Sequence, residues 1–209
     1  MNFDFERAPW RAISTVFPNV YVHGCTFHFV QALVKRINEE GLAYAYAKEP
    51  GTRELLKKMM ALCYFPAKWI PNLFYKLKVK CTTPNLIAFV VYTEKTWIES
   101  TIFPPYAWSA FGYFKRSTNP FQGWHRQLKT HCKLNTAFYL FIHTLHTIAK
   151  DTEFDVNRVC EEQITERRHA RYAAANEKLH KYWDQYTECE LAVYPLLKKC
   201  AQLYSPSTV

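Results

Sequence analysis

The chain has little glycine, no hydrophobic run of membrane-spanning length and no closely spaced cysteine pair. Its 209 residues include five glycines, which argues against a disordered chain and against a turn-rich all-β protein. The longest apolar run, 86–92, is far shorter than the roughly 20 residues of a membrane-spanning helix. The seven cysteines are scattered, odd in number and without a C-x-x-C pair, so free thiols in a reducing compartment fit better than a disulfide framework.

The sequence predicts no secretory signal peptide, because Asp4 and Glu6 stand where such a segment needs a basic and then an apolar region. We therefore expect a soluble, intracellular protein with no membrane partner. What the chain does have is 49% hydrophobic residues, 17% aromatic residues and a formal net charge of +9. The apolar content is ample for the core of one domain, or of one domain and a piece. The charge favours nucleic acid as a partner about as much as it favours a basic surface kept for solubility.

Local patterns predict a mainly α-helical chain. Apolar residues at a helical period predict helices over 2–17, with Asp4 as the N-cap, and over 26–38. A short β-branched strand, 20–23, lies between them. One strand cannot form a sheet, so we expect its partners to lie upstream or in another chain.

The middle of the chain predicts interrupted helices over 42–77 and a short aromatic helix over 106–114. Residues 85–98 are ambiguous, because their β-branched residues favour a strand. Thr83 followed by Pro84 is a helix-start signal, and we take it as deciding for a helix.

The last part of the chain predicts three more helices. One begins at Asn135 and carries an apolar stripe to Ile148, after which 151–154 forms a joint. A long helix follows over 155–186, and a last helical piece over 188–203. The middle of the long helix is either a solvated face or a contact with the DNA backbone, and its arginines are Arg167, Arg168 and Arg171.

The stretch 117–128 reads S-T-N-P-F-Q-G-W-H-R-Q-L and has the pattern of a helix start. Pro120 after Asn119 sacrifices only an N–H that a helix leaves unpaired. With Asn119 as the N-cap, Gln122 takes the third helical position, which is the spacing of a capping box. Trp124 then lies on one face and basic groups on another. The residues of this region that we consider as DNA contacts or motif residues are Arg116, His125, Arg126 and Lys129.

This stretch resembles the T-N-N-x-x-E-G-W-H-R signature of Mutator-like element (MULE) transposases. Two earlier blocks resemble the same family, in the same order. The first comprises Asp4-Phe5-Glu6, Phe17-Pro18 and Gly24-Cys25-x-Phe27-His28 with Gln31. The second comprises Tyr92-x-Glu94-x-Thr96-Trp97-Ile98, Phe103-Pro104-Pro105 and Trp108. Each block alone is modest, but the ordered trio is specific, and it covers most of the chain to about residue 148.

The resemblance implies the C-terminal portion of an RNase H-like α/β core with one remaining strand. It divides the chain into a remnant of the catalytic core (1–41), a helical insertion domain (42–116), the signature helix with the following core helix (117–150) and a helical tail (151–209). It also implies DNA as the partner, a nuclear location and no small-molecule substrate, and it leaves a homo-oligomer open. Its chemistry is a two-metal mechanism, in which Mg²⁺ ions about 3.5–4 Å apart are bound by three carboxylates.

One of those three carboxylates is present at a matching position. Asp4 matches the family's second Asp and is the expected Mg²⁺ ligand, whereas the first Asp would lie upstream of Met1. Gln122 replaces the Glu, and its amide oxygen brings no negative charge to a divalent ion. We therefore expect no independent catalysis. Glu94 and Glu99 match no catalytic position.

Cys25 and His28 match the family's C-x-x-H motif. With His23 they would be three zinc ligands within six residues, but no distant fourth ligand accompanies them. Packing, or orientation of the active-site region, is the better interpretation.

Three functions are compatible with this sequence. The leading one is a truncated, inactive relative of enzymes that cleave and join DNA strands. The second is a non-enzymatic DNA-binding or regulatory protein that derives from a transposase and uses its basic surface. The third is a degenerate fragment that folds poorly because its sheet has lost its central strands.

Overall fold

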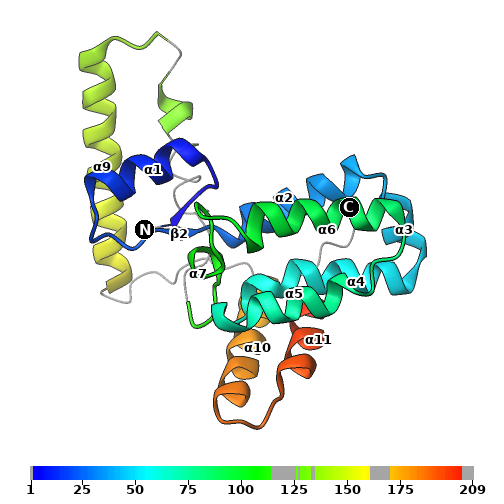
Figure 1. The fold of residues 1–209 in the computed structure, drawn as a ribbon. Coiled ribbons are helices and arrows are strands. Elements are labelled where there is room, and N and C mark those ends of the chain that lie inside the picture. Colours follow the sequence, from blue (N-terminus) through cyan, green and yellow to red (C-terminus); the bar gives the residue numbers. More distant parts are fainter. Residues whose placement is uncertain (1, 114–125, 127, 133–134, 161–169, 204–209) are drawn as a thin grey trace. The chain divides into compact units, whose positions relative to one another are not determined.

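The computed structural model describes residues 2–113, 126, 128–132, 135–160 and 170–203 (Figure 1). The chain divides into two compact units, the first made of Met1–Ser117 with Ala174–Val209 and the second of Thr118–Ala173. Each unit is considered by itself below. The four-segment division expected from the sequence stays a prediction.

The described chain is mainly helical, as the sequence predicts. Its strands and first helices are β1 (Asn2–Phe3), α1 (Arg7–Val16), β2 (His23–Gly24), α2 (Thr26–Glu39), α3 (Ala43–Lys48) and α4 (Pro50–Met60). The 3₁₀ turns η1 (Ala61–Tyr64) and η2 (Ala67–Trp69) follow, then α5 (Ile70–Lys78), α6 (Pro84–Thr93), the π-helical turn η3 (Glu94–Ile98) and α7 (Pro105–Trp108). The last helices are α9 (Phe138–Cys160), α10 (Ala170–Thr187) and α11 (Val193–Leu203).

The prediction of a first helix beginning at residue 2 with Asp4 as its N-cap is wrong. Asn2–Phe3 form strand β1, and α1 begins at Arg7. The strand predicted over 20–23 is shorter and later, covering His23–Gly24, and it pairs with β1 in parallel. Asp4 makes tertiary contacts in place of a helix cap: its carboxylate pairs with His28, and its carbonyl accepts a hydrogen bond from the indole of Trp10.

Gly24 ends strand β2 at the closest approach between the two strand segments. A Cβ atom on Gly24 would lie 2.2 Å from Cζ of the Phe5 ring. The ring is wedged in place, since it stands edge-on to Trp97 at 4.6 Å and to Phe103 at 5.3 Å between ring centroids. Glycine is therefore required here for space, and the pairing of β1 with β2 depends on it.

The core of the first unit lies between layers of helices (Figure 1). Helix α2 packs on α6 and α4, and α4 packs on α5 and α11. The apolar faces of these helices supply most of the interior. The largest buried side chains are Trp97, Trp108, Phe29, Phe65, Phe74, Phe89, Leu33, Ile37, Leu56, Met59, Met60 and Leu62.

The C-terminal helices complete this core. The indole Nε1 of Trp183, on α10, donates to the carbonyl of Tyr64 at 2.9 Å and joins residues 119 positions apart. Helix α11 packs on α4 and η1, and its buried side chains are Leu196, Leu197, Cys200 and Ala201. Residues 174–203 therefore contribute apolar surface to the same interior as residues 29–108.

The helix predicted over 85–98 is confirmed. Thr83 is the N-cap of α6, and its Oγ1 accepts a hydrogen bond from the backbone N–H of Leu86 at 3.4 Å. Pro84 takes the first helical position, as the start signal predicts. The helix continues into η3, where the chain loosens to a π-helical turn before Glu99.

In the second unit, the joint predicted at 151–154 is wrong, because α9 continues through it to Cys160. That stretch contains no glycine or proline to end a helix. Thr152 directs its Oγ1 back to the carbonyl of Ile148 at 2.8 Å, a bond compatible with a continuous helix. Of the long helix predicted over 155–186, residues 155–160 lie in α9 and residues 170–186 lie in α10 (Ala170–Thr187), while residues 161–169 fall outside the described part of the chain, so this helix stays a prediction.

We expect Gly24→Ala to lower the free energy of unfolding by about 1–3 kcal/mol, because the added methyl overlaps a ring that cannot move aside. Urea denaturation measures the change. The matched control is Gly51→Ala at the start of α4, where a Cβ meets nothing within 4 Å. That variant should be neutral or gain up to about 1 kcal/mol. Equal stability of the two variants would contradict this account of Gly24.

Candidate functional site

Asp4 and His28 meet where the two parallel strands end. Asp4 follows β1 directly, and His28 stands in the first turn of α2, which begins two residues after β2. The Nδ1 atom of His28 lies 2.8 Å from Oδ1 of Asp4. The Asp4 side chain is 51% exposed and that of His28 18% exposed, so the carboxylate faces solvent while the imidazole is mostly covered. Two residues that the sequence singled out separately thus form one pair.

The indole of Trp10 holds the backbone of Asp4 in place. Its Nε1 donates to the carbonyl of Asp4 at 2.7 Å, and the Trp10 side chain is buried. At 2.8 Å, the carboxylate of Asp4 and the imidazole of His28 make a close polar contact. In this pair, the backbone of Asp4 is held by Trp10, and His28 is held by the first turn of α2.

Beneath this pair lies a group of six rings, which we call the aromatic cluster. The ring of Phe29 stacks on Trp108 at 4.5 Å and stands edge-on to Trp97 at 5.0 Å between centroids. The Nε1 atom of Trp108 lies 3.2 Å from the carbonyl of Trp97 and 3.1 Å from that of Phe103. The cluster comprises Phe5, Trp10, Phe29, Trp97, Phe103 and Trp108. Four of these residues, Phe5, Trp97, Phe103 and Trp108, stand in the motif blocks of the sequence, which did not predict that they meet.

His23 has a structural role in this arrangement. Its side chain is 2% exposed, and its Nε2 lies 2.8 Å from the carbonyl of Ser109. Since a carbonyl only accepts, Nε2 carries the proton of a neutral ring. Burial is the main cause that lowers the pKa of His23 below its ordinary value. The hydroxyl of Ser109 in turn donates to the carbonyl of Phe65, so His23 ties β2 to the segment after α7.

The described residues at the strand ends do not make a complete site for Mg²⁺. Asp4 pairs with a histidine, and no third His, Cys, Asp or Glu joins them among the described residues. Mg²⁺ prefers several oxygen ligands in octahedral geometry, and imidazole is a poor substitute. Cys25 is fully buried at the N-terminus of α2. Glu94 is engaged elsewhere, since both of its oxygens accept from Nζ of Lys78 at 2.6–2.7 Å.

Several residues expected from the sequence to contact DNA or to carry the signature fall outside the described residues. Arg126 and Lys129 are described and exposed. Arg171 lies in α10, but its side chain is outside the described part. The positions wholly outside it are Arg116, Gln122, Trp124, His125, Arg167 and Arg168.

A second group of charged side chains was not predicted from the sequence. Lys58 and Lys80 both direct their Nζ atoms to the hydroxyl of Tyr194, at 3.2 and 3.3 Å, and Lys58 also bonds Glu54 at 2.6 Å. The spacing of Glu54 and Lys58 on one helix is visible in the sequence. The approach of Tyr194, 136 residues after Lys58, is not.

Comparison with known proteins found no matching family model, no matching curated protein and no matching solved structure. The resemblance to MULE transposases therefore stays a prediction. Across the described residues, no helix combines the length and the apolar character needed to cross a membrane.

We expect the His23 contact to make stability depend on pH. Because the folded state holds the pKa of His23 below that of the unfolded chain, this contribution is complete above the unfolded value of about 6.5. It is lost as the pH falls from there through the lowered folded pKa, since the unfolded chain takes up a proton that the folded ring resists. Melting temperatures recorded from about pH 8 down to about pH 5 measure this loss of stability.

His23→Gln should flatten this pH dependence, because an amide can still donate to the Ser109 carbonyl and does not titrate. His143→Gln, on an exposed part of α9, is the matched control and should keep the wild-type profile. A His23→Gln profile as steep as that of the wild type would contradict the assignment.

Proposed function

We propose that the chain is a MULE transposase-type protein that binds DNA and does not cleave it by itself. The single observation that carries this proposal is the meeting of two sequence blocks beneath Asp4. Phe5, from the first block, packs edge-on to Trp97 and Phe103 from the second. Two blocks far apart in the sequence are thus parts of one structural unit, which supports reading them as one motif set.

The position of Asp4 supports the same lineage. The resemblance implies a second Asp at the end of a strand and a C-x-x-H motif near it, and here Asp4 follows β1 while the motif begins after the parallel strand β2. Strand ends of parallel sheets gather functional side chains at one edge. The RNase H-like assignment of this region is part of the proposal.

The absence of cleavage rests on the chemistry of the ligand set. Two-metal cleavage requires carboxylates to bind both ions and to balance their charge. Gln122 supplies no charge at the position of the third carboxylate. Asp4 pairs with His28, and one carboxylate beside an imidazole is poorly suited to holding two Mg²⁺ ions.

DNA binding rests on the net charge of +9 and on exposed cations such as Arg126 and Lys129. Positive side chains displace counterions from the phosphate backbone, and this displacement drives binding without sequence preference. A nuclear location would follow from such a substrate.

We expect the purified chain to leave supercoiled plasmid intact in the presence of Mg²⁺ or Mn²⁺, as gel electrophoresis would show. Metal-dependent nicking that Asp4→Ala abolishes would overturn the proposed inactivity, because it would show that Asp4 serves a complete site. Nicking that survives in Asp4→Ala would indicate a contaminating nuclease, and Lys35→Gln, on an exposed part of α2, controls for the effect of substitution itself.

We also expect binding to duplex DNA to weaken steeply with salt, with log K falling by about 0.9 per phosphate contact for each unit of log salt concentration. Fluorescence anisotropy with a labelled duplex measures the slope. The double variant Arg126→Gln with Lys129→Gln should reduce the slope. Absence of binding at low salt would sink the DNA-binding proposal.

A further inference from the structure

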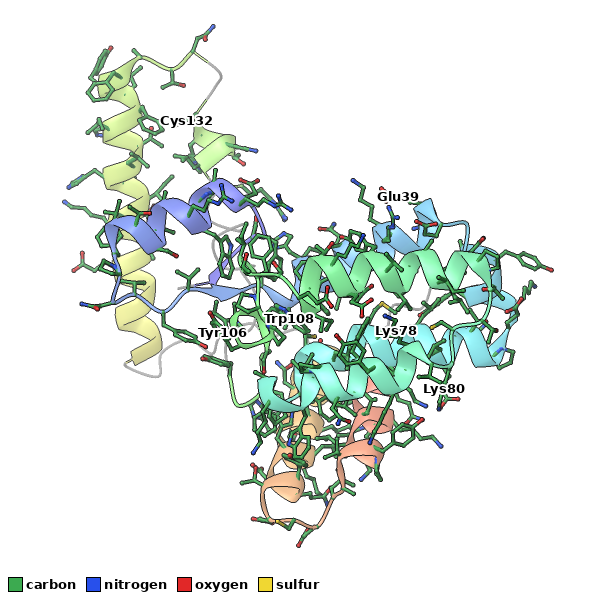
Figure 2. All side chains as sticks on the ribbon, in the orientation of Figure 1. Glu39, Lys78, Lys80, Tyr106, Trp108 and Cys132 are labelled. Carbon is green, nitrogen blue, oxygen red and sulfur yellow. The ribbon has the colours of Figure 1, made fainter. Side chains whose placement is uncertain are left out.

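Helices α4 and α11 and the segment after α5 bring two lysines and one tyrosine to a hollow on the first unit. The hollow has a volume of about 190 Å³ and is lined by Gly51, Glu54, Leu55, Lys58, Leu77 and Lys80. That volume is several times the roughly 30 Å³ that one water molecule occupies in the liquid. Tyr194, on α11, stands beside it, and Lys80 lies just beyond the end of α5 (Figure 2).

The hydroxyl of Tyr194 is the point on which the two lysines converge. Their Nζ atoms lie 3.2 and 3.3 Å from it, and both also lie over the tyrosine ring, at 4.9 and 5.6 Å from its centroid. Because a lysine ammonium only donates, the hydroxyl oxygen accepts from both. The two cations lower the pKa of Tyr194. One oxygen atom therefore gathers two positive charges at one spot.

Burial of Lys58 makes this charge unusual. Its side chain is 8% exposed, whereas lysines are ordinarily among the most exposed residues. Burial lowers the pKa of Lys58, but the hydrogen bonds that its ammonium donates to Glu54 and Tyr194 outweigh this effect and raise the pKa, so the group is charged. A buried ammonium attracts an anion more strongly than an exposed one, because water screens it less.

The negative charge at the hollow is smaller than the positive charge. The hydrogen bond from Lys58 is the main cause that lowers the pKa of the Glu54 carboxyl, and the charges of Lys198 and Lys80 lower it further. The side chain of Glu54 is 54% exposed, so the ion pair that it forms with Lys58 is weak and easily rearranged. The lining of the hollow holds one carboxylate, Glu54, and two ammonium groups, Lys58 and Lys80, so it carries a net positive charge.

We propose that this lysine–tyrosine hollow is a subsite for a phosphate group of the DNA backbone. The inference rests on the proposed function for its choice of nucleic acid, and on the side chains of the hollow for its choice of phosphate. A phosphate oxygen would accept from Lys58 and Lys80 in the place of Glu54, which swings into solvent. Tyr194 is the positioning residue, because its hydroxyl aligns both ammonium groups.

The test compares DNA affinity and its salt dependence in single variants, using a labelled duplex. Lys80→Gln should weaken binding about three- to tenfold at low salt and reduce the salt slope by about 1. Lys35→Gln is the matched control, because it removes the same charge from a side chain that is 78% exposed on α2, and its slope should stay that of the wild type. Equal losses in the two variants would overturn the proposal.

Two further variants distinguish phosphate binding at the hollow from non-specific attraction between DNA and the positive charge of the protein. Glu54→Gln should raise DNA affinity severalfold, because no carboxylate then competes with the phosphate, whereas Glu39→Gln on α2 should raise it less. Tyr194→Phe should lower affinity without any change of charge, and circular dichroism checks that it stays folded. Unchanged affinity in Glu54→Gln and Tyr194→Phe would count against the subsite.

Inorganic phosphate distinguishes failure of the subsite from failure of the proposed function. At constant ionic strength, with chloride as the reference, phosphate should raise the melting temperature of the wild type but not of Lys80→Gln. A phosphate effect without any DNA binding would support the anion site and overturn DNA as its occupant. DNA binding that is insensitive to Lys80→Gln, with no phosphate effect, would overturn the subsite and leave the proposed function standing.

Discussion

The indole of Trp108 is the contact on which the arrangement of the first unit depends. Its ring stacks on Phe29 of α2, and its N–H reaches the carbonyls of η3 and of the loop before α7. An indole buries about 150–250 Å² of surface, and its single donor must find an acceptor when it is buried. Both requirements are met at once only if α2, η3 and that loop keep their relative positions. The rings of Phe5 and Trp10 rest on this assembly.

The two strands are a consequence of that packing and contribute little stability of their own. Strands of two residues each are far below the length at which a sheet is stable alone. They lie side by side because Phe5 fills the space above Gly24 and because Trp10 fixes the carbonyl of Asp4. The Asp4–His28 pair follows from the same constraint, since Asp4 comes directly after β1 and His28 stands in the first turn of the helix that follows β2. Side-chain packing thus creates the local backbone geometry at the candidate site.

Some elements could be predicted from the sequence because their cause is local. Thr83 and Pro84 start a helix through atoms within one turn, and the structure has that helix. Asp4 failed as an N-cap because its partner, His28, is brought near by strand pairing that no local pattern encodes. The role of the C-terminal helices was equally hidden, since the bond from Trp183 to Tyr64 spans 119 residues. Motif resemblance singled out Asp4 and His28, but only three-dimensional packing makes them a pair.

The two charged sites of the first unit differ in how completely they are built. At the hollow, a buried ammonium, a second lysine and a phenol converge, so an anion would meet donors already in position. At the strand ends, a single carboxylate pairs with a histidine, so a divalent cation would have to recruit most of its ligands from water. Preorganised donors favour binding, whereas an incomplete ligand set disfavours phosphodiester chemistry. On this physical basis, holding DNA demands less of the described residues than cutting it, and the proposed function follows that difference.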